Sequence, residues 1–154
     1  MLSHDEINEI NHEIGQYPVK SAACIEALKV VQKHRGWVPD DAVKDIAGHL
    51  EMSPEEVDSV ATFYNLIFRQ PVGRNVILLC DSVSCWLLGY EKLQDHIKSK
   101  LGIGFGETSK DGRFTLLPMS CLGTCVHAPA LMINSDLHRD LTLEKLDNIL
   151  ENYK

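Results

Sequence analysis

The sequence lacks several features that would point to common functions. No apolar run approaches the ~18 residues that a membrane-spanning helix needs. Basic residues are few: 15 Lys and Arg stand against 22 Asp and Glu, which gives a formal net charge of −7. A chain with this charge is a poor candidate for binding nucleic acid or an anionic lipid surface. We therefore expect any association with a membrane to be indirect.

The first residues also lack a targeting signal. MLSHDEINEI has no basic region followed by an apolar stretch, and it lacks the Arg-rich, acid-poor composition of a transit peptide. We therefore expect the chain to remain in the cytoplasm, where structural disulfides are rare. The five cysteines then become the most informative residues of the sequence.

Residues 1–72 have the apolar spacing of short amphipathic helices. Ser3 and Glu6 form a capping-box pattern ahead of the first helix, and Ser53-Pro54-Glu55-Glu56 is a similar signal ahead of a later one. Ser21 is the expected cap of a helix between them. Four short helices in this region predict a small bundle, which forms an N-terminal domain.

Residues 73–154 change from helical spacing to continuous apolar runs, which are typical of buried strands. The alternation of strands and helices predicts a small α/β layer domain, so that the whole chain has an α+β fold. The expected segments are a strand at 75–79, a helix at 90–101, short strands near 107–108, at 114–117 and at 130–133, and a last helix that Thr142 caps.

Four cysteines lie where the expected strands end. Cys80 and Cys85 form a C-x4-C pair, Cys121 and Cys125 form a C-x3-C pair, and thirty-five residues separate the pairs. Because neighbouring strands lie only ~5 Å apart, two loops at strand ends can converge on one centre. Four thiolates are the ligand set of an iron–sulfur cluster or of one zinc ion.

Zinc binding and dithiol chemistry account for the cysteine spacing less well. Structural zinc sites normally contain a C-x2-C pair, and a dithiol redox enzyme needs C-x-x-C, but the sequence has neither spacing. A zinc site and a chance set of buried cysteines nevertheless stay open as alternatives. Cys24 stands alone on the apolar face of a helix, and we expect it to be an ordinary buried residue.

The residues between the cysteines suit a cluster. Gly123 allows positive φ, which would turn backbone N–H groups toward sulfur. Leu122, Val83 and Val126 are expected to form an apolar shell around the centre.

The remaining conspicuous residues carry no catalytic pattern. His127 is either a neighbour of the centre or a solvated loop residue, and Trp86 either shields the centre or contacts a partner. Trp37 and Tyr64 are expected to pack within the helical bundle. No nucleophile–base set, carboxylate pair or dinucleotide-binding loop stands out, so we expect no catalytic residue on this chain.

The cysteine spacing and several flanking motifs resemble the thioredoxin-like [2Fe–2S] ferredoxin family. The motifs are Cys80-Asp81-Ser82-Val83-Ser84-Cys85, Asp111-Gly112-Arg113-Phe114 and Cys121-Leu122-Gly123-Thr124-Cys125. Gly36-Trp37-Val38-Pro39 and Val60-Ala61-Thr62-Phe63-Tyr64 resemble one branch, the 24-kDa or E subunits of bacterial NADH-quinone oxidoreductase (respiratory complex I).

This resemblance implies a helical N-terminal domain and a thioredoxin-like domain with one [2Fe–2S] cluster on Cys80, Cys85, Cys121 and Cys125. It also implies two partners: a subunit that binds FMN and NADH, and an iron–sulfur subunit with several clusters. The chain would exchange single electrons with the flavin, as part of a complex at the inner face of the plasma membrane. Related modules of NAD-linked hydrogenases and formate dehydrogenases give an alternative context.

Overall fold

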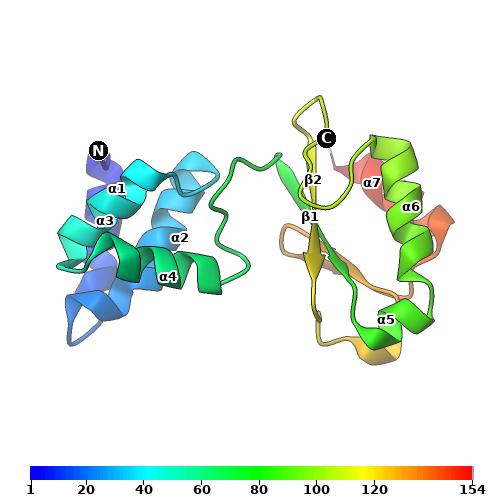
Figure 1. Ribbon diagram of the computed structural model, residues 1–154, viewed down its shortest axis with the longest axis horizontal. Coiled ribbons are helices and arrows are strands. Elements are labelled where there is room, and N and C mark those ends of the chain that lie inside the picture. The colour runs from blue at the N-terminus through cyan, green and yellow to red at the C-terminus, as the bar shows by residue number, and fades with distance from the viewer. Residues whose placement is uncertain (154) are drawn as a thin grey trace. The chain divides into compact units, whose positions relative to one another are not determined.

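The computed structural model describes residues 1–153, and the chain divides after Pro71 into two compact units (Figure 1). The N-terminal unit is helical and the C-terminal unit contains a sheet, as predicted for this α+β chain. None of the helices within residues 1–153 combines the length and the apolar composition that a membrane span requires.

The N-terminal unit is a bundle of four α-helices around one apolar core. Buried residues from every helix form that core, among them Ile10, Leu28, Ile46 and Val57. Cys24 belongs to the same core, as expected. The helices are α1 (His4–Ile14), α2 (Cys24–Arg35), α3 (Asp40–Leu50) and α4 (Pro54–Phe63), with a 3₁₀ turn, η1 (Lys20–Ala23), before α2.

The two capping boxes are present, but the prediction for Ser21 was wrong. Ser3 with Glu6 caps α1, and Ser53 with Glu56 caps α4, through reciprocal hydrogen bonds. Ser21 instead lies within η1, whose 3₁₀ hydrogen bonds supply the turn that leads into α2.

The expectation that Tyr64 packs within the bundle was also wrong. Tyr64 follows the end of α4 and is exposed, in edge-to-face contact with the exposed ring of Phe63. Because α4 stops at Phe63, the helical spacing that would have placed Tyr64 on the apolar face ends one residue too early.

Glu6 forms a buried ion pair that joins α1 to α2. Its side chain is almost fully buried, and its oxygens accept hydrogen bonds from the Arg35 guanidinium at 2.7 and 2.8 Å and from the Ser3 N–H at 2.7 Å. The Arg35 hydrogen bonds are the main reason that the pKa of Glu6 falls from its usual 4.5 to about 2.

This lowered pKa predicts an acid-sensitive N-terminal unit. Below pH 4.5 the unfolded chain protonates Glu6, whereas the folded chain keeps the carboxylate charged until about pH 2. The stabilisation is therefore complete above pH 4.5 and is lost as the pH falls toward 2. We expect Glu6→Gln to lower the free energy of unfolding at pH 7 by about 3 kcal/mol.

Urea titrations of the full chain at pH 7 and pH 3 test this prediction, with Trp37 fluorescence as the probe in a Trp86→Phe background. Glu56→Gln is the matched control, because Glu56 has the same capping-box role but is exposed and lacks an arginine partner. Equal losses in the two variants would show that the Arg35 pair contributes nothing beyond capping.

The C-terminal unit is a mixed four-stranded sheet with strand order β2-β1-β3-β4. β1 and β2 are parallel, whereas β3 pairs antiparallel with both β1 and β4. The elements are β1 (Asn75–Cys80), α5 (Val83–Leu87), α6 (Tyr90–Leu101), β2 (Phe114–Met119), η2 (Cys125–His127), β3 (Leu131–Ile133), β4 (Asp136–His138) and α7 (Leu143–Asn152).

Helices α6 and α7 lie side by side on one face of this sheet (Figure 1). Leu93 and Ile97 of α6 and Leu146 and Leu150 of α7 share one core with the strands. The central strand β1 is buried along its whole length, which explains its continuous apolar sequence. The strand residues of this core are Ile77, Leu79, Phe114, Leu116, Leu131 and Ile133.

The structure corrects the predicted strands at two places. Residues 107–108 form no strand, because Thr108 makes only an isolated bridge to Thr115. The fourth strand is instead β4, which was not predicted, and neither was the five-residue helix α5. Both elements are too short for apolar periodicity to indicate them.

Candidate metal centre

The sheet brings the two cysteine pairs to one edge. Cys80 is the last residue of β1 and pairs in register with Met119, the last residue of β2. Cys121 follows Met119 by two residues, so the two segments leave neighbouring parallel strands side by side. The second cysteine of each pair lies on a short helical turn, Cys85 on α5 and Cys125 at the start of η2, and these two turns contact each other.

The sulfur atoms lie close together within each pair. All cysteines are free thiols, and the Sγ atoms of Cys121 and Cys125 lie 3.9 Å apart. The thiols of Cys80 and Cys85 are within hydrogen-bonding reach of each other. Gly123 has φ of +72°, as expected, and its N–H donates to the Cys121 sulfur at 3.3 Å.

The electrostatic environment of Cys85 includes a cysteine of each pair. Burial raises the pKa of Cys85 to about 11, and the nearby Cys80 and Cys125 thiols act in the same direction. A backbone hydrogen bond at Ala130 opposes this rise. Without a cation the thiol is therefore neutral at pH 7, whereas a coordinated metal ion would hold it as the thiolate.

The donor set fits a binuclear iron centre. Two thiolates on one tetrahedral metal at ~2.3 Å lie about 3.8 Å apart, close to the 3.9 Å between Cys121 and Cys125. A [2Fe–2S] cluster takes two thiolates on each iron, which matches two pairs at one sheet edge. Within residues 1–153, no three His, Cys, Asp or Glu side chains are arranged around a single metal position.

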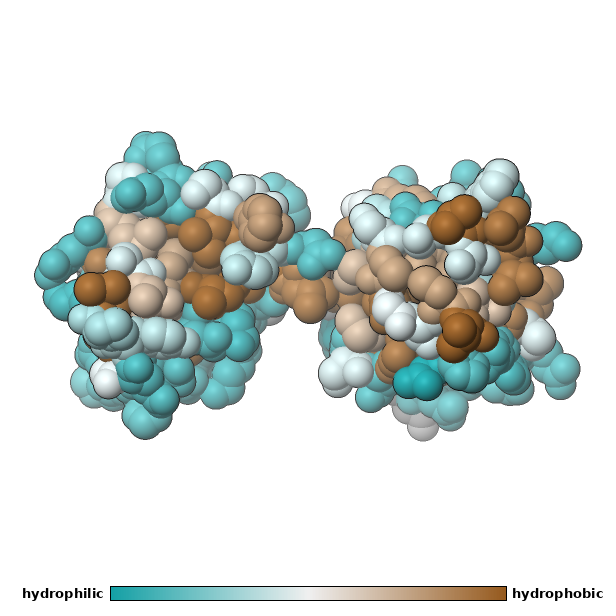
Figure 2. Space-filling view, turned by 90° about the horizontal axis from the view of Figure 1, so that it is seen from below, coloured by the Kyte–Doolittle hydropathy of each residue, from teal (hydrophilic) through white to brown (hydrophobic). Residues whose placement is uncertain are grey.

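The surface around these cysteines is apolar and open. Val83 and Val126, expected to form part of an inner shell, are exposed instead, Val126 by 90%. Trp86, Leu87 and Leu88 are exposed as well. We call Val83, Trp86, Leu87, Leu88 and Val126 the α5 patch. Figure 2 views the molecule from the side of α5 and shows brown apolar surface on the C-terminal unit. The sequence signal for it was the run Trp86-Leu87-Leu88 directly after a cysteine.

His127 has a partner that was not predicted from the sequence. Its Nδ1 lies 3.1 Å from the Asp140 carboxylate, and its backbone carbonyl accepts a hydrogen bond from the Asp140 N–H at 2.8 Å. His127 is therefore an anchored residue and not simply a solvated one. No short-range sequence pattern links the two residues, because thirteen positions separate them.

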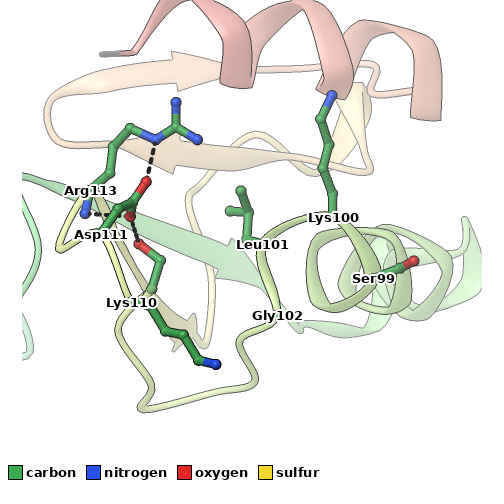
Figure 3. Close-up of a pocket in the computed structure, with 8 residues that line it drawn as sticks. Ser99, Lys100, Leu101, Gly102, Lys110, Asp111 and Arg113 are labelled. Carbon is green, nitrogen blue, oxygen red and sulfur yellow. Dashed lines mark hydrogen bonds and ion pairs between the residues drawn. The ribbon is translucent and has the colours of Figure 1, made fainter.

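A pocket of about 520 Å³ lies at the other end of the sheet (Figure 3). The end of α6 and the turn before β2 line it. Asp111 organises that turn by accepting hydrogen bonds from Ser109 Oγ at 2.5 Å and from the Arg113 N–H at 3.0 Å. Since no cysteine lines this pocket, it does not contribute to the candidate centre.

Comparisons with known proteins agree with this architecture. The model of the thioredoxin-like [2Fe–2S] ferredoxin family matches residues 10–154. The chain is 51% identical over 153 residues to the E subunit of NADH-quinone oxidoreductase from Pseudomonas aeruginosa, covering 99% of this chain and 92% of that one. It is 52% identical to the corresponding E subunit of Escherichia coli K12, with the same coverage.

A solved structure shares the fold. The crystal structure of an NAD⁺-reducing [NiFe]-hydrogenase in the H2-reduced state aligns with a TM-score of 0.73 at 24% sequence identity. The alignment covers 85% of this chain and 22% of the hydrogenase chain. Together, the family match and the E-subunit relatives show that this chain belongs to the thioredoxin-like [2Fe–2S] ferredoxin family.

Proposed function

We propose that this chain is an electron-transfer subunit of an NADH-quinone oxidoreductase, with one [2Fe–2S] cluster held by Cys80, Cys85, Cys121 and Cys125. The observation that carries the proposal is the meeting of two cysteine pairs at one edge of the sheet, with 3.9 Å between Cys121 and Cys125. When bound, such a cluster accepts and donates one electron at a time.

The residues of this chain would hold the cluster and control its surroundings. Four thiolates supply the ligands, and the Gly123 N–H supplies a dipole toward the Cys121 sulfur, which offsets negative charge. No residue of the proposed site is suited to hydride transfer. NADH and FMN would therefore bind on a partner protein, as the similarity to the E subunits of NADH-quinone oxidoreductases suggests.

Exposed apolar residues support a role within a larger assembly. The α5 patch lies directly beside Cys85 and Cys125, where a partner would exclude water from the centre. The end of α4 in the N-terminal unit presents a second apolar group, formed by Phe63, Tyr64 and Leu66. We propose that a flavin-binding subunit covers the α5 patch and that the complex, with a further multi-cluster subunit, lies at the inner face of the plasma membrane.

A second context is the same module within an NAD-linked hydrogenase or formate dehydrogenase. The shared fold of the NAD⁺-reducing [NiFe]-hydrogenase favours the hydrogenase form of this alternative. Identity above 50% with E subunits over almost the whole chain favours the NADH-quinone oxidoreductase.

Two measurements test the proposed function. Metal and acid-labile sulfide analysis of anaerobically purified protein should give equal amounts of iron and sulfide; a colourless protein with one zinc and no sulfide would reject the electron-transfer role. Affinity purification from the source organism should then recover an FMN-containing subunit and a multi-cluster iron–sulfur subunit. Recovery of a nickel–iron or molybdenum subunit would assign the chain to the second context.

A further inference from the structure

The turn that carries Cys125 has little apolar burial to fix its position. None of the residues of η2 is buried, and Cys121 and Gly123 ahead of it are exposed too. A sulfur ligand must nevertheless be held in a defined place if a metal centre is to assemble on it. Hydrogen bonds from elsewhere in the unit must therefore position this turn.

Asp140 supplies two of these hydrogen bonds, and both reach His127, the last residue of η2. The Asp140 N–H donates to the His127 carbonyl at 2.8 Å, and the Asp140 carboxylate lies 3.1 Å from His127 Nδ1. Both the backbone and the side chain of His127, two positions after Cys125, therefore hold the turn in place.

Asp140 is itself fixed at the start of a well-packed helix. Its carbonyl accepts a hydrogen bond from Lys145 Nζ at 2.9 Å, and the next residue, Leu141, is buried and donates its N–H to the Pro129 carbonyl at 3.1 Å. Thr142 then caps α7. The Cys125 turn is therefore tied at two points to the segment that leads into α7.

The backbone of Asp140 has an uncommon conformation. Its φ is +48°, in the left-handed region that non-glycine residues rarely adopt. Such a conformation persists where surrounding contacts hold the residue in place. Asp140 is held by its contacts to His127 and Lys145.

We propose that Asp140 is a positioning residue for Cys125: through its paired hydrogen bonds to His127, it fixes the turn that presents the Cys125 sulfur beside Cys121. This inference rests on the proposed function, because it concerns a cysteine that we propose as a cluster ligand. Asp140 touches no sulfur itself and acts through the turn.

The test uses the full chain with its reconstituted cluster and the variant Asp140→Gly. Glycine removes the carboxylate but tolerates positive φ, so the variant isolates the side-chain contact from backbone strain. We expect iron release to a chelator to become about tenfold faster, as for other residues that orient metal ligands, and the EPR signal of the reduced centre to change. Asp140→Asn retains an acceptor oxygen and should restore both properties.

Glu51→Gly is the matched control. Glu51 is also an exposed acidic residue with positive φ (59°) that pairs with a basic side chain, Lys20 at 2.5 Å, but it belongs to the N-terminal unit. Its variant should release iron at the wild-type rate with an unchanged EPR signal. A similar acceleration in Glu51→Gly would mean that global stability, and not the Cys125 turn, controls iron release.

The outcomes separate this inference from the proposed function. If Asp140→Gly keeps the wild-type release rate and EPR signal, the inference is wrong while the cluster assignment stands. If wild-type protein holds no iron and sulfide, both fail together. Should Asp140→Gly not fold, His127→Ala removes the same contact from the other side, and wild-type iron release in that variant also overturns the inference.

Discussion

A Cys125→Ala variant is expected to lose the iron–sulfur centre while the metal-free chain keeps its fold. A [2Fe–2S] cluster needs four protein ligands, and the removal of one thiolate leaves an iron with an open position. Cys125 is exposed, so the substitution removes little packing. Iron and sulfide analysis, together with EPR of the reduced protein, should therefore show loss of the centre without unfolding.

Substitution of a buried ligand should lower the stability of the metal-free chain as well as remove the centre. Comparison with Cys125→Ala therefore separates the loss of a ligand from the loss of packing. Cys85 is 2% exposed, and Cys85→Ala should lose the centre and also lower the free energy of unfolding of the metal-free chain by about 1 kcal/mol. Cys24→Ala is the matched control, because Cys24 is similarly buried but lies in the helical core. It should keep the full iron and sulfide content with a similar packing loss.

One result would contradict the assignment of Cys125 as a cluster ligand. A Cys125→Ala protein with wild-type iron content, sulfide content and EPR signal would remove Cys125 from the ligand set.

The cluster should also stabilise the fold, since a metal bound only to the native state stabilises it by mass action. Chelation of iron from the wild type should therefore lower the melting temperature of the C-terminal unit, and it should have no such effect on Cys125→Ala.

The sequence was most informative where one local signal decides the structure. The capping boxes at Ser3 and Ser53 start α1 and α4, and the apolar run after Asn75 forms the buried strand β1. The cysteine pairs were placed at strand ends because breaks in the apolar runs marked those ends. The two cysteine segments then leave the sheet side by side, because the parallel pairing of β1 with β2 places the carboxyl ends of these strands together.

The sequence was least informative where distant residues decide the outcome. Ser21 has the chemistry of a cap, but the 3₁₀ turn η1 makes that cap unnecessary. Helix α5 contacts α6 and η2, and strand β4 pairs with its neighbour β3, but both elements are too short to show a period. The contact between His127 and Asp140 depends on how η2 and the start of α7 meet, which no local pattern encodes.

The second large effect is expected on partner binding, when an exposed apolar residue of α5 is substituted. Leu87 is 70% exposed although it lies two positions from a proposed ligand, and an apolar side chain in that place suits a site that a partner covers. Electron transfer from a flavin on the partner also requires that the two proteins bring their centres close together. We therefore expect Leu87→Glu to weaken binding to the flavin-containing subunit by about a hundredfold, since the new carboxylate would be buried without a partner charge.

The substitution should change binding while leaving the chain itself intact. A charge at an exposed position changes the free energy of unfolding by less than about 0.5 kcal/mol, so the iron content and EPR signal of Leu87→Glu should match the wild type. Val19→Glu provides the control, because Val19 is an exposed apolar residue of the N-terminal unit outside the α5 patch. Titration calorimetry with the purified flavin-containing subunit measures the affinities; wild-type affinity in Leu87→Glu would mean that the partner covers another surface, because a buried interface at α5 cannot accept an unpaired carboxylate without loss.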